Sequence, residues 1–256
     1  MTRTNVIQFS ESFPPVMDGV ANVARNYAYW IRQKYGKSYV VTPEFPGYVD
    51  DEIFPVIRYP SLPLALRKPY RLGVGVHNPG LWKKLYNLNV DLVHAQSPFS
   101  AGNIALQFAR QKNVPLVATF HSKFYDDFKE VTRSDAISWL MTHLVVDFFY
   151  YADAVWAVNE STKETLISYG YKGSIDVVPN GSDFVIPKDL DLLVRSSEKK
   201  YGISHEGLVF LFVGQMVKQK NVPMIIDALK RVRDAGQDFT MLFVGEGKSR
   251  EAFEET

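Results

Sequence analysis

The chain has 256 residues, of which 46% are hydrophobic and 22% charged, the composition of a globular protein that can bury a substantial core. Its formal net charge is +1 and it contains no cysteine, which excludes disulfides and thiolate metal sites and gives no indication of a nucleic-acid partner. Its apolar runs are too short for a membrane-spanning helix, and the N-terminal segment lacks the apolar stretch of a secretory signal. We therefore expect a cytoplasmic protein.

Short apolar runs rich in Val, Ile and Phe recur along the chain without regular polar alternation. Such runs are typical of strands that are buried on both faces of a parallel sheet. We expect strands at residues 5–9, 38–42, 91–95, 114–120, 152–158, 174–179, 208–214 and 239–245.

Segments with helical spacing separate most of these runs. Helices are expected at residues 19–35, 78–88, 101–112, 189–201 and 221–235. The apolar stretch 139–158 is interrupted by His143, Asp147 and Asp153, which favours a helix packed on the sheet, followed by a strand, over a membrane span. Strands that alternate with helices indicate a doubly wound α/β fold.

A connection between two domains is expected in PNGSDFVIPK, residues 179–188, which holds two prolines and a glycine. We place one domain in residues 1–184 and a second in residues 185–256. The second contains only two predicted strands, and the chain stops inside a predicted helix. We therefore expect the second domain to be incomplete.

Polar residues follow the predicted strands of both domains. Because ligands of open parallel sheets bind at the carboxyl ends of the strands, these residues mark the expected cleft. They are Ser10 and Glu11, His94, Gln96 and Ser97, His121 to Lys123, Asn159 and Glu160, Asn180 and Gly181, Gly214 and Gln215, and Gly245 to Gly247.

The loop after the first strand, SESFPPVMDGVAN, leads into a helix at Asp18 and Gly19. A helix N-terminus offers free amides to a phosphate, and glycine allows close approach to the backbone. The pattern is not GxGxxG, which argues against a nicotinamide dinucleotide. Helix capping by Asp18 is the alternative explanation.

Two lysines, Lys218 and Lys220, lie between a strand and a helix in the second domain. An ammonium there could neutralise a diphosphate leaving group without a metal, although a solvated loop lysine is the simpler interpretation. The pair Asp189 and Asp191 resembles a metal-binding Asp-x-Asp motif. Its place at a predicted helix start explains it without a metal, because acidic residues favour the first turn.

Residues 53–90 contain six basic side chains and no acidic one, with Trp82 and several leucines among them. This mixture suits an anionic membrane surface, and we expect acceptor or membrane contacts from Arg67, Lys68, Arg71 and Trp82. A solvated loop followed by a core-packed helix explains the same residues. Nothing in the segment resembles a nucleic-acid recognition module.

An ordered set of motifs spans nearly the whole chain: FPPVMDGVAN, DLVHAQSPF, ATFHSKF, ADAVWAVNESTKETL, VVPNGSDF and FVGQMVKQKN, followed by VGEG. Together they resemble the retaining GT-B glycosyltransferases of the family-four type, with bacterial diacylglycerol glucosyltransferases as the nearest suggestion. The resemblance implies two Rossmann-like domains, the first binding the acceptor and the second a nucleotide diphosphate sugar, and hexosyl transfer with retention and without a metal or other cofactor.

By this resemblance, Asp18 and Gly19 contact the donor diphosphate, His121 contacts the transferred sugar, and Lys220 binds the diphosphate. Gln215 occupies a position where the family usually has arginine, which removes one cation from the donor site. A glutamate pair of the family would lie beyond Thr256, so the chain alone is not expected to be fully competent.

Two alternatives stay open at this point. One is a non-catalytic fragment that binds the acceptor or a membrane, and the other is a sugar-nucleotide epimerase with the GT-B fold. For the transferase, a lipid such as diacylglycerol is the expected acceptor, UDP-glucose or a similar compound the donor, and the inner face of the cell membrane the expected location.

Overall fold

The computed structural model describes residues 3–64, 68–181, 186–203, 207–217, 220–247 and 250–254. The chain separates into two compact units, Met1–Asp183 and Phe184–Thr256, and each is considered by itself. This division falls within the proline-containing segment 179–188.

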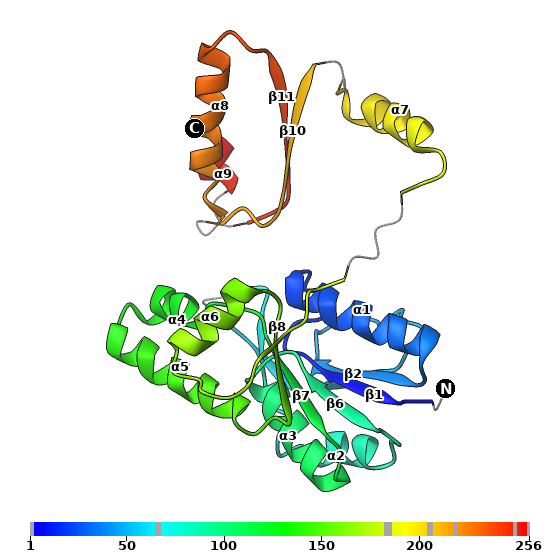
Figure 1. The fold of residues 1–256 in the computed structure, drawn as a ribbon. Helices are drawn as coiled ribbons and strands as arrows, with labels where there is room; N and C mark the ends of the chain where they lie inside the picture. Colours follow the sequence, from blue (N-terminus) through cyan, green and yellow to red (C-terminus); the bar gives the residue numbers. More distant parts are fainter. Residues whose placement is uncertain are drawn as a thin grey trace. The chain divides into compact units, whose positions relative to one another are not determined.

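Unit 1 is built on a parallel sheet, whose order in the described residues is β3-β2-β1-β6-β7-β8-β9 (Figure 1). β1, β2 and β7 are buried along their whole length, which confirms the prediction of strands covered on both faces. The strands are β1 (Val6–Phe9), β2 (Ser38–Pro43), β3 (Val56–Tyr59), β6 (Leu92–Ala95), β7 (Leu116–Phe120), β8 (Ala154–Ala157) and β9 (Asp176–Val177).

The strand order reverses between β1 and β6. From β1 the chain builds outward through β2 to β3, and it then returns to add β6 on the opposite side of β1. Val6 of β1 therefore lies beside both Ser38 of β2 and Leu92 of β6. Such a reversal leaves a crevice outside the carboxyl ends of the two strands, where ligands of doubly wound sheets bind.

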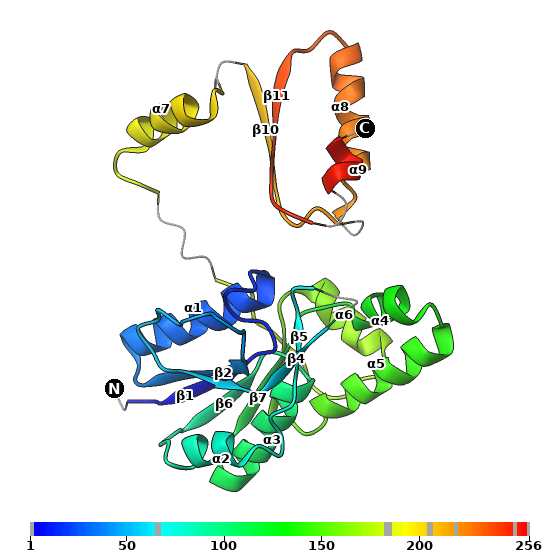
Figure 2. The same cartoon turned by 180° about the vertical axis from the view of Figure 1, so that it is seen from behind.

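Helices cover both faces of this sheet (Figures 1 and 2). α1 packs on one face, where Tyr27 lies against the ring of His94, and α3 packs on the other, where Phe108 lies against Phe9. The helices of unit 1 are α1 (Gly19–Lys34), α2 (Pro79–Tyr86), α3 (Ser100–Lys112), α4 (Phe124–Thr132), α5 (Asp135–Phe149) and α6 (Glu160–Ser168).

Several elements were not predicted from the sequence. β3 is a four-residue strand between Pro55 and Pro60, and β4 (Ser61–Pro63) and β5 (Arg71–Gly73) form a short antiparallel pair. Helices α4 and α6 were missed as well. α6 buries only Leu166, so its sequence carries little apolar periodicity.

Helix α5 presents apolar side chains to solvent as well as to the core. Val145, Val146 and Phe149 are buried, as the sequence predicted for this segment, whereas Leu140 and Leu144 are 63% and 64% exposed. No helix in the described part of the chain is long and apolar enough to cross a membrane.

Unit 2 contains two parallel strands in its described residues, β10 (Leu208–Val213) and β11 (Phe239–Val244). Its helices are α7 (Leu190–Tyr201), α8 (Val222–Asp234) and α9 (Arg250–Glu254). Both strands were predicted, but β10 is largely exposed although its sequence is as apolar as that of the buried strands of unit 1.

Candidate functional site

The N-termini of α1 and α3 lie at the carboxyl edge of β1 and β6. We consider α3 first. Its Ala101 amide donates to Oε1 of Glu11 at 2.9 Å, and the hydroxyls of Ser100 and Tyr59 reach Oε2 at 3.2 and 3.3 Å. Burial raises the pKa of the Glu11 carboxyl, against the lowering effect of the hydrogen bonds from Ala101 and Ser100. This helix end is therefore filled by a carboxyl group of the protein itself.

The second helix N-terminus belongs to α1 and begins at Asp18 and Gly19. Asp18 caps the helix, since Oδ1 accepts from the Ala21 amide at 2.8 Å and Oδ2 accepts from Ser12 Oγ at 2.7 Å. No hydrogen bond to the amides of Gly19 or Val20 is found among the residues that the structure describes. These amides are the free donors that an anion at a helix N-terminus uses.

Gly19 faces open space. A Cβ added there would meet no atom within 4 Å, and the side chain of a larger residue would occupy the volume in front of the helix end. Packing in unit 1 therefore gives no reason for a glycine at this position, whereas close approach of a ligand to the backbone does.

His121 directly follows β7 and is half-buried. Its Nε2 lies 2.7 Å from Oε1 of Gln96. Burial lowers the pKa of His121 to about 4, although the Asp18 carboxylate acts in the opposite direction. The imidazole is therefore neutral at pH 7, and the loops after β1 and β7 bring Asp18, Gly19 and His121 to the same edge of the sheet.

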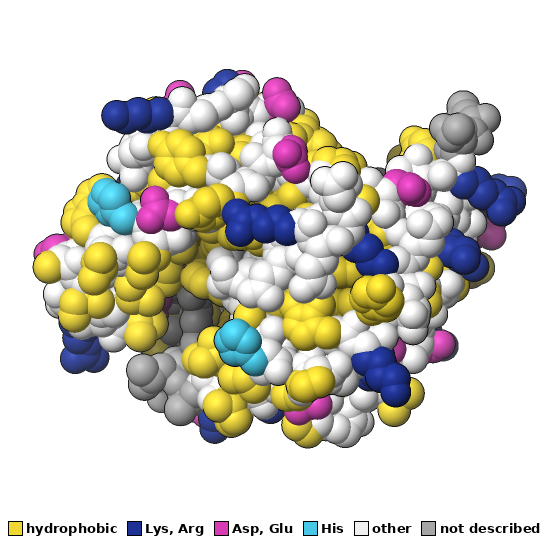
Figure 3. Space-filling model, turned by 90° about the horizontal axis from the view of Figure 1, so that it is seen from below, with side chains coloured by type: hydrophobic (Ala, Val, Ile, Leu, Met, Phe, Trp, Pro, Cys, Tyr) yellow, Lys and Arg dark blue, Asp and Glu magenta, His cyan; other side chains and the backbone are white. Residues whose placement is uncertain are grey.

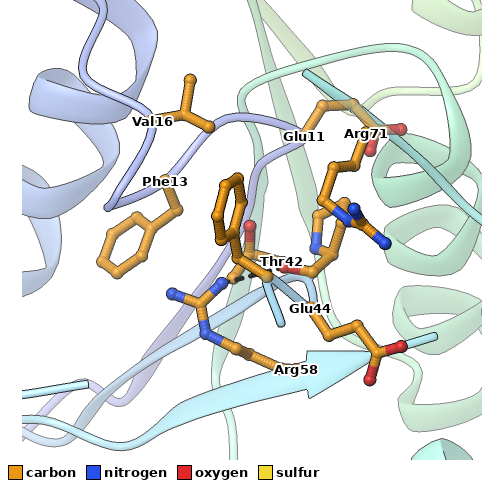
Figure 4. Close-up of a pocket in the computed structure, with 9 residues that line it drawn as sticks. Glu11, Phe13, Val16, Thr42, Glu44, Arg58 and Arg71 are labelled. Atoms are coloured by element: carbon orange, nitrogen blue, oxygen red, sulfur yellow. Dashed lines mark hydrogen bonds between the residues drawn. The ribbon is translucent and has the colours of Figure 1, made fainter. Parts of the chain in front are cut away.

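A small cavity of about 10 Å³ lies beside Glu11 (Figure 4), room for about one water molecule. Arg58 and Arg71 line it from β3 and β5. Both guanidinium groups are bound by the protein: Arg58 contacts Asp50 at 2.7 Å, and Nε of Arg71 donates to Ser61 Oγ at 2.7 Å.

The predicted membrane contacts have different environments. Trp82 packs partly buried against the core, and its Nε1 donates to the Val76 carbonyl at 2.7 Å, while Arg71 is half-buried and bound to Ser61. Lys68 is exposed, and Arg67 lies outside the described residues. Leu62 and Leu72, on β4 and β5, are 56% and 47% exposed, so this hairpin presents apolar side chains next to a lysine.

In unit 2, Gln215 and Lys220 are exposed in the loop between β10 and α8, and Lys218 lies outside the described residues. The glycines of the VGEG motif allow the backbone of this loop to be approached closely, because they carry no Cβ. A Cβ at Gly245 would lie 1.8 Å from the Gly214 carbonyl oxygen, and a Cβ at Gly247 would lie 2.1 Å from that of Met216. The loops after β10 and β11 therefore pack backbone against backbone.

The Asp189 and Asp191 pair stands at the start of α7, with Asp189 at the N-cap and Asp191 in the first turn. That is the position for which helix-dipole stabilisation was predicted. No group of three or more His, Cys, Asp and Glu side chains arranged for a metal ion is found in the described ranges.

Sequence reasoning missed a buried polar cluster next to His121. Gln8 is fully buried, and His94 and Gln96 are each 2% exposed. The sequence marks Gln96 and His94 only as polar residues near a strand end, and Gln8 lies inside the apolar run NVIQF. No local pattern indicates that side chains 88 positions apart, such as Gln8 and Gln96, are hydrogen-bonded.

An apolar groove of about 310 Å³ lies between α3, α4 and α5. Phe99, Leu106, Phe128, Leu144, Val145 and Phe148 are among its lining residues. In Figure 3, hydrophobic side chains gather at the left, the side on which α5 lies in Figure 1.

Comparison with solved structures identifies the fold. The catalytic domain of starch synthase IV from Arabidopsis thaliana, bound to ADP and acarbose, matches with a TM-score of 0.59 and 13% identity, over 100% of this chain and 71% of that one. The α/β fold is therefore that of the GT-B glycosyltransferases.

Family models match most of the sequence. The model described as Glycosyltransferase Family 4 matches residues 17–184, and the model described as Glycosyl transferases group 1 matches residues 194–256. Because the first match alone covers more than half of the chain, the chain belongs to glycosyltransferase family 4.

Curated relatives match at 22–29% sequence identity. Alpha-monoglucosyldiacylglycerol synthase of Streptococcus pneumoniae is 23% identical over 93% of this chain and 55% of its own length. The enzyme of the same name from Acholeplasma laidlawii is 22% identical over 94% of this chain and 63% of its own. A 2-deoxystreptamine glucosyltransferase of Streptomyces kanamyceticus is 29% identical over 59% of this chain and 39% of its own. The chain thus spans between half and two thirds of the first two relatives.

Proposed function

We propose that this chain takes part in hexosyl transfer from a nucleotide diphosphate sugar, such as UDP-glucose, to the hydroxyl group of a membrane lipid such as diacylglycerol. The observation that carries the proposal is the convergence of His121 with the free α1 N-terminus at the strand-order reversal of unit 1. The names of the two relatives that match more than nine tenths of the chain support the lipid acceptor.

The roles of the residues follow from their chemistry. The amides at Gly19 would bind the donor diphosphate, and Asp18 would act indirectly, since both of its oxygens are already used to hold the start of α1. Lys220 would supply a cation to the diphosphate and Gln215 a hydrogen-bonding group. Neutral His121 would contact the transferred sugar. The relatives' names specify an α-glucoside, which from an α-linked donor corresponds to retention.

The direct test is turnover. The chain, and a longer form that covers the full length of its relatives, are incubated with UDP-glucose and with vesicles that contain diacylglycerol. We expect an α-glucosyl lipid, identified by mass spectrometry and by the NMR coupling of its anomeric proton. Release of UDP without any acceptor would favour an epimerase or a hydrolase, and turnover by neither form would refute the transferase.

A matched pair of histidine variants tests the site. His121→Ala should lower turnover about tenfold or more, the equivalent of one lost hydrogen bond in a buried site. His143→Ala is the control, because His143 is exposed on α5 and its Nδ1 lies 2.8 Å from the Trp139 carbonyl oxygen within the same helix. Equal turnover of the two variants would remove His121 from the site.

Contact of the basic segment 53–90 with a membrane is tested with a second matched pair of variants. Lys83 and Lys84 lie in the last turn of α2, and Lys199 and Lys200 lie in the last turn of α7. At about 1 kcal/mol per lysine near an anionic surface, replacing both lysines of α2 by serine should weaken binding to anionic vesicles roughly tenfold or more. The α7 pair should have little effect. The opposite order would place the membrane contact elsewhere.

A further inference from the structure

Four polar side chains form a buried cluster on the α1 face of the sheet, behind His121. Gln8 of β1 lies in register with His94 of β6, and Thr119 of β7 and Gln96 complete the cluster. All four are at most 4% exposed. Polar groups so deeply buried are costly unless they are hydrogen-bonded; the bonds among them orient His94, Thr119 and Gln96, while Nε2 of Gln8 has no partner among the described residues.

His94 anchors one side of the cluster. Its Nε2 lies 2.7 Å from Thr119 Oγ1, and its ring lies between those of Tyr27 and Trp156, with both centroids 5.1 Å away. Burial lowers the pKa of His94 to about 3, so this ring is neutral. His94 is thereby held rigidly beneath the loop that carries Gln96.

Gln96 connects this cluster to His121. Its Nε2 donates to Gln8 Oε1 at 2.9 Å, which leaves Oε1 directed at Nε2 of His121, 2.7 Å away. An amide oxygen only accepts hydrogen bonds. At that distance the imidazole nitrogen must donate, so Nε2 carries the proton and, in a neutral ring, Nδ1 carries a lone pair.

We propose that Gln96 is a positioning residue, whose Oε1 holds His121 as the Nε2–H tautomer and so leaves Nδ1 as an acceptor for a hydroxyl group of the bound sugar. The sugar contact rests on the function proposed above, whereas the tautomer does not. No hydrogen bond to Nδ1 of His121 is found in the part of the chain that the structure describes. A second residue that holds a histidine in one tautomer is a common arrangement where the free nitrogen must bind a ligand.

The tautomer can be measured directly. Long-range proton–nitrogen NMR spectra of the 256-residue chain, labelled with ¹⁵N-histidine, distinguish a protonated ring nitrogen from a bare one, and His121→Asn identifies the signals of His121. We expect the Nε2–H form at neutral pH. An Nδ1–H form would show that Gln96 donates instead of accepting, and would overturn the proposal.

Three variants separate positioning from packing. Gln96→Leu removes the acceptor and should give a mixture of tautomers, whereas Gln96→Glu keeps an accepting oxygen and should keep Nε2 protonated. Gln8→Met removes the partner of Gln96 but leaves Oε1 in place, and it should keep the wild-type tautomer. An unchanged tautomer in folded Gln96→Leu, or a mixture in Gln8→Met alone, would contradict the assignment.

Turnover provides a readout that a purely structural role would not produce. Gln96→Leu should lower kcat/KM about tenfold or more, as His121→Ala does, but should lower it less than twofold when His121 is already alanine, because residues that act as one unit are not additive. Additive losses would assign Gln96 a structural role only. If no form of the protein turns over, the proposed function fails and the tautomer measurement still decides this inference.

Discussion

The two units of this chain contain strands of nearly the same character in different surroundings. LVATF in β7 is buried at every position, whereas in LVFLFV of β10 five of six residues are exposed. β7 lies between β6 and β8 with helices on its faces, while β10 has only β11 beside it among the described residues. The comparison shows that an apolar run predicts a strand reliably, but that its burial depends on neighbours supplied from elsewhere in the fold.

The largest difference should appear when the units are separated. We expect residues 1–183 alone to unfold in one cooperative thermal transition, because the sheet buries its own strands. Residues 184–256 alone should show no such transition and should self-associate through the exposed strand. Circular dichroism and light scattering measure both. A cooperative transition in residues 184–256 would show that the exposed strand is stable without further cover.

A matched pair of phenylalanine variants quantifies the contrast. Phe120 is fully buried and packs against Phe124, Phe149 and Tyr169, so Phe120→Ala should lower the free energy of unfolding of unit 1 by about 3–5 kcal/mol. Phe210 is 38% exposed and lies outside unit 1, so Phe210→Ala should leave the cooperative transition of unit 1 within about 0.5 kcal/mol of wild type. Denaturant unfolding of both variants checks the values, and similar costs would mean that Phe210 is covered in solution.

Two glycine variants should have opposite effects in the two units: the variant in unit 2 should disturb the structure, and the variant in unit 1 should lower turnover without doing so. Gly245 has a φ of +150° and no room for a Cβ, so Gly245→Ala should force the loops after β10 and β11 apart, which faster cleavage of unit 2 by a protease would reveal. Gly19→Ala should leave the melting temperature of unit 1 unchanged or slightly higher, while lowering turnover. If Gly19→Ala also destabilises the unit, then Gly19 is a structural residue and its proposed place at the diphosphate fails.

Acid should weaken unit 1 in a way that depends on its buried histidines. The pKa of His94 is about 3 in the folded chain, against about 6.5 when unfolded. The folded state therefore binds fewer protons below about pH 6.5, and the free energy of unfolding falls on acidification, by at most about 1.4 kcal/mol per pH unit for one histidine.

The variant His94→Gln should make this acid dependence shallower. His143→Gln, at an exposed position, should leave it unchanged. Denaturant midpoints measured from pH 7 to pH 4 decide between these outcomes, and equal slopes in wild type and His94→Gln would show that His94 is protonated in the folded chain. His121, whose pKa burial lowers to about 4, contributes a further acid dependence of the same sign.

Much of the fold could be predicted because its signals are local. The runs that became β1, β2, β6 to β11 are continuous in sequence, and the spacing of α1, α3 and α8 is visible within each helix. β3 to β5 were missed because they are short and lie among prolines and glycines. Their pairing depends on distant partners, which no window of the sequence contains.

The residues of the candidate site also fall into two groups, those with a local sequence signal and those defined by distant contacts. Asp18, Gly19 and His121 were recognised at strand ends or helix starts, where a local pattern exists. Gln96 and Gln8 acquire their significance only through contacts with residues from other strands. Trp82 and Arg71 were predicted at a membrane from composition alone, and composition does not reveal that Val76 and Ser61 already bind them.

The Glu11 carboxyl group has a consequence for how an anionic ligand is oriented. Helices α1 and α3 both begin at this crevice, and the dipole of either helix could attract a diphosphate to its N-terminus. Because Glu11 already accepts from the amide of Ala101 at α3, that amide is not free for an incoming anion, whereas no partner is found for the amides of Gly19 and Val20 at α1 among the described residues. The protein thus fills one of the two helix N-termini with its own side chain, so that under the proposed function the donor diphosphate would bind at the other N-terminus in a single orientation.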